Sequence, residues 1–127
     1  MQHANLYQQY KAQSLETITK GEVVVKLFEE TSKQISKAIF HSKGNDSYQS
    51  YNAIAKAQKI IQTLTFSLDM NHAISIELRE LYLFLYDHLG KAASNNDVVL
   101  LKDLLALVDD LKVAFRQADR LSRMGNK

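Results

Sequence analysis

The sequence contains no cysteine and no proline, and only four of its 127 residues are glycine. The absence of cysteine excludes disulfide bridges and thiolate metal sites, and nothing indicates an oxidising compartment. Proline and glycine mark turns and strand ends, so their scarcity favours long helices with few connections. With 46% hydrophobic residues, the chain has enough apolar material for one domain with its own core.

Strong charge of one sign and long apolar runs are also absent. A net charge of +2 and a pI of about 8.8 are too mild to predict nucleic-acid binding. The longest uncharged apolar run, Leu81–Tyr86, is far shorter than the ~18 residues of a membrane span. The first residues show neither the basic nor the apolar part of a signal peptide. We therefore expect a cytoplasmic protein without a membrane span or a nucleic-acid partner.

Four segments place apolar residues at helical spacing, and each predicts a helix with one face in a core. The pattern breaks at residues 69–72 and 95–96, and the short connections make sequential helices antiparallel neighbours. The predicted fold class is all-α, an antiparallel four-helix bundle. The four stripes are Val24, Leu27, Phe28, Thr31, Ile35, Ala38 and Ile39; Ile54, Ala57, Ile61, Leu64 and Leu68; Ile74, Leu78, Leu81, Leu85, Leu89 and Ala92; and Leu101, Leu104, Val108, Leu111, Phe115 and Ala118.

Cap residues mark the ends of these helices. Thr19 opens a capping box, which places the first helix at about residues 20–42. Gly44 is the predicted left-handed C-terminal cap of that helix. Asp46 and Asp97 are the predicted N-caps of the second and fourth helices.

The N-terminal residues differ from the rest of the chain. They hold Leu6, Tyr7 and Tyr10 among polar residues, which is too little apolar surface to fold alone. We predict an N-terminal lid segment at residues 1–18, packed as a short segment or helix on a bundle of residues 19–122. Residues 123–127 are expected to form a flexible tail.

Some helices carry more apolar surface than a four-helix core needs. Apolar stripes wider than 100° are common in globular helices, so core packing is one explanation of this surplus. An exposed patch would instead mark an interaction site for another polypeptide, which is the function that this surface indicates. The additional residues are Leu100, Leu107, Ala114 and Leu121, spaced by seven, with Tyr82, Leu83, Phe84, Tyr86, Ile60 and Phe66.

No pattern of residues predicts catalysis, a metal or a cofactor. The four histidines are far apart in sequence, and the Glu-x-x-His pairs of ferritin-like di-iron bundles do not occur. The sequence also has no glycine-rich phosphate loop and no nucleophile motif. We therefore predict a protein that is not an enzyme, and a bundle metalloenzyme ranks well below a binding protein.

Four blocks of the sequence, taken together, resemble the flagellin-specific export chaperones of the bacterial flagellar type III secretion system, the FliS family. The resemblance runs from about residue 6 to residue 118. The chain departs from the family at Lys20–Gly21, where proline and glutamate are usual, and at Phe115, where tryptophan is common. The blocks are Leu6–Gln9; Thr17–Thr19 with Glu22–Glu29; Lys56–Ile61 with Leu64 and Ser67–Asp69; and Leu78–Leu85 with Asn95–Asp97 and the helix through Phe115.

The resemblance implies a bundle that binds the disordered C-terminal region of flagellin in the cytosol, prevents its premature polymerisation and delivers it to the export gate. Flagellin and components of the export gate are thus the expected partners. The resemblance also implies that the N-terminal segment covers part of the binding cleft when no client is present. The alternative is a helical homodimerisation or adaptor module without a flagellin client.

Seven residues are candidates for partner binding. Tyr7 is the expected anchor of the lid and a client contact, and Tyr10 lies on the same segment. For each of the other five, burial in the core is an equally good interpretation. These five candidate groove residues are Ile60, Leu64, Leu68, Tyr82 and Phe115.

Overall fold

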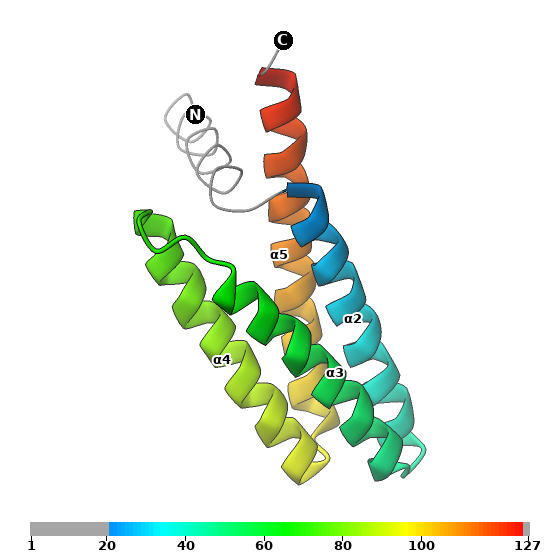
Figure 1. Ribbon diagram of the computed structural model, residues 1–127. Coiled ribbons are helices and arrows are strands. Elements are labelled where there is room, and N and C mark those ends of the chain that lie inside the picture. The colour runs from blue at the N-terminus through cyan, green and yellow to red at the C-terminus, as the bar shows by residue number, and fades with distance from the viewer. Residues whose placement is uncertain (1–20, 126–127) are drawn as a thin grey trace.

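The computed structural model describes residues 21–125, and within them the chain forms four helices and no strand. The helices are α2 (Gly21–Lys43), α3 (Ser47–Phe66), α4 (Ala73–Asn95) and α5 (Val98–Gly125). Sequential helices run antiparallel (Figure 1), so the predicted all-α four-helix bundle is confirmed. The predicted lid segment, with Tyr7 and Tyr10, and the capping residue Thr19 lie outside the described residues.

Two turns at one end of the bundle use the same Asn–Asp pair. Asn45 and Asn96 adopt left-handed conformations with φ of 60° and 48°, which asparagine tolerates better than most residues. The amides of Asp46 and Asp97 then donate to carbonyl oxygens five residues earlier, at 2.8 and 3.0 Å, as in a Schellman motif. The prediction of Gly44 as the left-handed cap is wrong, because α2 continues one residue further before the chain turns.

The same two aspartates start the following helices. Asp46 Oδ1 accepts from the Gln49 amide at 3.1 Å, and Asp97 Oδ1 accepts from the Leu100 amide at 3.0 Å. Both predicted N-caps are therefore confirmed. Each Asn–Asp pair ends one helix and starts the next, so the chain reverses direction within two or three residues.

The connection between α3 and α4 is longer and is held by local hydrogen bonds. The Ser75 hydroxyl donates to the Asp69 carbonyl at 2.6 Å, and the Asn71 amide donates to the Asp69 carboxylate at 3.0 Å. His72 occupies the N-cap position of α4 but makes no side-chain capping bond. The start of α4 thus lacks the capping that α3 and α5 receive from aspartate.

The core of the bundle has an aromatic centre. The Phe28 ring lies 5.1 Å from the Phe115 ring and 6.1 Å from the Tyr82 ring, so α2, α4 and α5 meet there. Most residues of the four predicted stripes are buried around this centre. The stripe residues that remain only partly buried are Leu27, Ile39, Ile74, Leu81 and Leu111.

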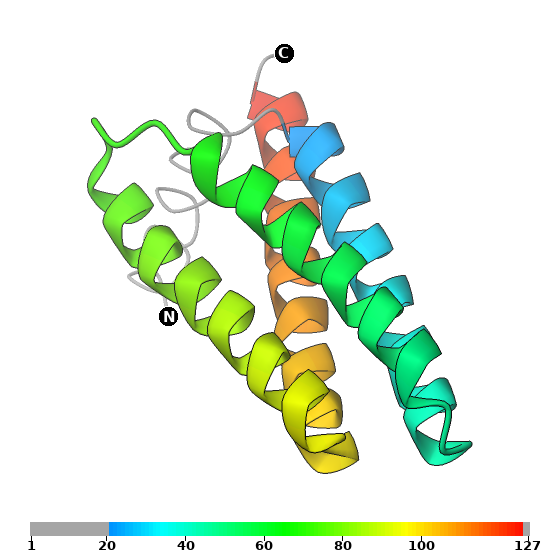
Figure 2. The same ribbon diagram turned by 60° about the horizontal axis from the view of Figure 1, so that its bottom comes forward.

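The four helices are not held together equally. α2 packs between α3 and α5, whereas α4 packs mainly on α3. α4 and α5 meet at their connecting turn and diverge toward the opposite end, as two views of the bundle show (Figures 1 and 2). Among residues 21–125, no side-chain hydrogen bond or ion pair joins α4 to α5.

The last helix extends beyond the end of the expected bundle. α5 continues to Gly125, so residues 123–125, which were expected in the tail, are helical. Arg123 lies 2.9 Å from the Glu22 carboxylate on α2 and 3.3 Å from Asp119 one turn earlier. These contacts tie the end of α5 to the start of α2.

Candidate functional site

Three polar contacts fix which side of α5 faces α2. The α5 partners recur every seven residues and therefore form one stripe along the helix. The two helices are thus joined by side-chain contacts along the first half of α2. The pairs are Ser32 with Asp109 at 2.8 Å, Glu29 with Arg116 at 2.9 Å and Glu22 with Arg123 at 2.9 Å.

The opposite flank of α5 is apolar. A residue two positions before each of these polar residues is rotated from it by about 200° around the helix axis. These positions hold Leu107, Ala114 and Leu121. Leu107 and Ala114 are half-buried, and Leu121 is 38% exposed. The sequence stripe spaced by seven therefore lies on the side of α5 that faces away from α2.

α4 presents a matching flank. Gln58 Nε2 on α3 donates to the Tyr86 carbonyl at 3.0 Å, which marks the side of α4 that faces α3. Ile74, Leu81 and Phe84 lie on the other flank, where Phe84 is 44% exposed. We call the six residues Ile74, Leu81, Phe84, Leu107, Ala114 and Leu121 the α4–α5 apolar flanks.

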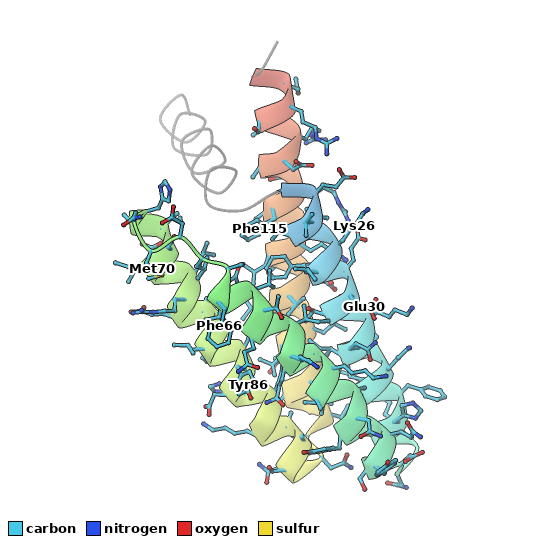
Figure 3. All side chains as sticks on the ribbon, viewed as in Figure 1. Lys26, Glu30, Phe66, Met70, Tyr86 and Phe115 are labelled. Atoms are coloured by element: carbon cyan, nitrogen blue, oxygen red, sulfur yellow. The ribbon has the colours of Figure 1, made fainter. Side chains whose placement is uncertain are left out.

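Further large apolar side chains are exposed around α4 and at the end of α3. Phe66, at the end of α3, is 78% exposed, and Met70 follows it in the connection (Figure 3). Ile76, Leu83 and Tyr86 are exposed on α4. α4 therefore carries exposed or half-buried apolar residues around most of its circumference, which is the surplus that the sequence indicated. Such a surface is typical of a helix that contacts a partner.

The candidate groove residues occupy two different environments. Leu64, Leu68, Tyr82 and Phe115 are buried in the core, so no partner contacts them unless the residues that cover them move. Only Ile60 among these five is half-buried and accessible. A role of these residues in partner binding, like that of Tyr7 and Tyr10, stays a prediction.

Ile60 lies in a groove between α2 and α3. The groove has a volume of about 350 Å³, and Leu27 and Ile60 contribute its apolar floor. A second groove of about 360 Å³, between α3 and α4, is more polar and includes Gln58 and Gly90. The residues that line the first groove are Leu27, Glu30, Gln34, Lys56, Lys59, Ile60 and Thr63.

Tyr82 carries an unusual buried hydroxyl group. Its Oη atom is buried and has no hydrogen-bond partner among the described residues. Burial alone raises the pKa of this phenol well above its ordinary value, because the phenolate would lose its hydration. The group therefore stays protonated at physiological pH and has no role there as a base.

Residues 21–125 contain neither a metal-binding cluster nor a membrane-spanning helix. No group of three His, Asp or Glu side chains in this range is close enough to share a metal ion. None of the four described helices is long and apolar enough to cross a membrane.

Three exposed aromatic residues were not singled out from the sequence. Phe40, Tyr48 and Tyr51 lie near the α2–α3 turn, and each is more than half exposed. Tyr48 and Tyr51 are three residues apart, so they share one side of α3, and neither belongs to the buried stripe that begins at Ile54. This spacing could have predicted from the sequence that both lie on the outer surface.

Comparison with known proteins agrees with this architecture. The family model described as "Flagellar protein FliS" matches residues 3–122 of the chain. The chain is also 31% identical over 119 residues to the "Flagellar secretion chaperone FliS" of Bacillus subtilis (strain 168), and the match covers 94% of this chain and 90% of the relative. The chain therefore belongs to the FliS family of flagellar export chaperones.

Proposed function

We propose that this protein is a cytoplasmic, non-enzymatic chaperone that binds the disordered C-terminal region of flagellin. It keeps flagellin from polymerising prematurely and delivers it to components of the flagellar export gate. Membership of the FliS family supports the export role. The structural observation that carries the proposal is the pair of α4–α5 apolar flanks on two helices that diverge and share no described polar link.

A client that folds on binding typically buries on the order of 1,000–3,000 Å² and loses several kcal/mol to ordering. It therefore needs a long apolar surface more than a single deep pocket. The α4–α5 apolar flanks extend over several turns of both helices, from Ile74 to Phe84 and from Leu107 to Leu121. Rings such as Phe84 supply large contact areas, and a few such anchors usually dominate the affinity.

The direct test is isothermal titration of the full chain with a peptide of the last ~40 residues of the host flagellin, a length suited to coupled folding and binding. We expect saturable one-to-one binding with a negative heat-capacity change, because apolar surface leaves water. No heat and no complex in gel filtration would refute the proposal for this client.

Two substitutions test whether the α4–α5 apolar flanks are the contact surface. Phe84→Asp and Leu121→Asp are each expected to weaken peptide binding by about tenfold or more, since a buried carboxylate without a partner is costly. Phe40→Asp is the matched control: Phe40 is 74% exposed near the α2–α3 turn, away from the flanks. Equal losses in all three variants, each with native helicity, would show that the flanks are not the site.

Two further measurements test the predicted lid segment and the homodimerisation alternative. Deleting residues 1–18 should tighten peptide binding if this segment competes with the client for the flanks. Light scattering across protein concentration tests the homodimerisation alternative. A dimer that Leu121→Asp converts to monomer, without any binding of the flagellin peptide, would favour the adaptor module over the chaperone.

A further inference from the structure

The groove between α2 and α3 differs in chemistry from the α4–α5 apolar flanks. Its floor includes Leu27 and Ile60, and Lys56 and Lys59 of α3 line it. Glu30 is its one acidic residue, and its carboxylate accepts a hydrogen bond from Gln34 Nε2 at 2.8 Å. The groove therefore combines a small apolar floor with a basic wall.

More lysines continue this basic surface on α2. Lys26, Lys33 and Lys37 share the outward stripe of Glu30, since they are spaced by four, three and seven residues from it. Lys26 and Glu30 project from α2 away from the bundle (Figure 3). No carboxylate of the described residues lies within 4.0 Å of the ammonium groups of the five lysines, which are Lys26, Lys33, Lys37, Lys56 and Lys59.

This face carries more unpaired basic charge than acidic charge. The five lysines and Glu30 have a summed formal charge of +4, whereas Glu22 and Glu29, which also lie on the outer side of α2, are each paired with an arginine of α5. On α5, by contrast, Lys112, Arg116 and Arg123 are each within 3.3 Å of a carboxylate. The lysines of α2 and α3 have no such partner within residues 21–125, so their charge can attract an anionic group.

The two surfaces lie on opposite edges of the bundle. α3 packs against both α2 and α4, and α2 packs against both α3 and α5, so the four helices form a ring that is open where α4 and α5 diverge. In that ring the edge between α2 and α3 is opposite the edge between α4 and α5 (Figure 2). A partner on one edge therefore leaves the other edge free.

We propose that the α2–α3 face, which we call the lysine groove, docks an acidic segment of a partner polypeptide. One large apolar side chain of that segment packs over Leu27 and Ile60, while its carboxylates pair with the surrounding lysines. The apolar floor favours a polypeptide over a nucleic acid, because no arginine or aromatic ring lines the groove for base contact or stacking. Its site is separate from that of the flagellin client, so both bind at once.

The test uses a fluorescein-labelled peptide of about 12 residues, roughly three helical turns, with glutamates at every third or fourth position and one central leucine. Anisotropy with the full chain should show saturable binding that weakens as salt is raised. The double variant Lys56→Glu/Lys59→Glu should weaken binding by about tenfold or more. Ile60→Ala should weaken it by about threefold or more, since the apolar contact is reduced.

The matched control is Lys102→Glu/Arg120→Glu, which makes the same change in net charge at two exposed positions of α5. It should change the affinity by less than about twofold. Equal weakening in both double variants would show that binding depends only on the net charge of the protein, and it would overturn the proposal. So would tighter binding of a single-stranded oligonucleotide or of anionic lipid vesicles at the same lysines, or displacement of the probe by saturating flagellin peptide.

Discussion

Replacement of Tyr82 by phenylalanine should stabilise the free protein. The Tyr82 hydroxyl is buried in the aromatic centre and has no acceptor among the described residues. A buried, unsatisfied polar group costs about 1–3 kcal/mol of folding free energy. Phenylalanine keeps the ring that packs 6.1 Å from Phe28, so the variant removes the cost without opening a large cavity.

The void left by the oxygen offsets part of this gain, because the surrounding atoms lose contacts. We expect a net stabilisation of about 1 kcal/mol, which is a rise in Tm of roughly 4 °C for a domain of this size. Thermal and urea unfolding followed by circular dichroism measure both quantities. Tyr86→Phe is the matched control. Tyr86 is 40% exposed on the same helix, so removing its hydroxyl should change the free energy of unfolding by less than about 0.5 kcal/mol.

A decrease in stability of about 1 kcal/mol or more in Tyr82→Phe would refute this reasoning, because it would show that the hydroxyl is hydrogen-bonded in solution. An equal change in Tyr86→Phe would likewise show that the effect does not come from burial.

Burial raises the pKa of Tyr82 above its usual value near 10, so this group leaves the free energy of unfolding independent of pH below about pH 10 and lowers it at higher pH, where the unfolded phenol ionises while the folded one stays protonated. Above about pH 10, urea unfolding should therefore show the free energy of unfolding of the wild type falling by up to about 1.4 kcal/mol per pH unit more than that of Tyr82→Phe, and parallel curves would contradict this. Gly90→Ala should gain about 1 kcal/mol from helix propensity only in a Gln58→Ala background, because the new Cβ would lie 3.2 Å from Gln58 Nε2. A double-mutant cycle measures that coupling, and additive effects would exclude it. Asp46→Ala and Asp97→Ala should each destabilise by about 1 kcal/mol through loss of the N-cap, as chemical denaturation will show, and a neutral result at either site would remove its capping role.

The sequence was sufficient for the fold because helix periodicity and N-caps are local signals. The stripe from Ile54 to Leu68 is buried throughout, and both aspartate N-caps form. The C-terminal cap of α2 was missed by one residue because Gly44 and Asn45 both suit a left-handed conformation. The choice depends on where the last helical hydrogen bond falls, and sequence pattern does not resolve that.

The candidate surface was harder to predict because it depends on contacts between distant residues. The contacts that turn one flank of α5 toward α2 join residues 77 to 101 positions apart. Tyr82 and Phe84 are two residues apart and both aromatic, yet one is buried in the core and the other is 44% exposed. Periodicity identifies that a helix has a second apolar flank, but only its neighbours determine whether that flank is covered.

These features together distinguish α4 from the other three described helices. It lacks the aspartate N-cap that α3 and α5 have, contains Gly90 in its interior, carries the unsatisfied hydroxyl of Tyr82 and has one described side-chain hydrogen bond to a neighbouring helix, from Gln58. These features leave α4 less firmly held in the bundle than α2, which is joined to α3 and α5 by four side-chain hydrogen bonds. A binding partner on the α4–α5 apolar flanks therefore meets the least anchored helix of the bundle, whereas the lysine groove lies on α2 and α3, which pack extensively on each other.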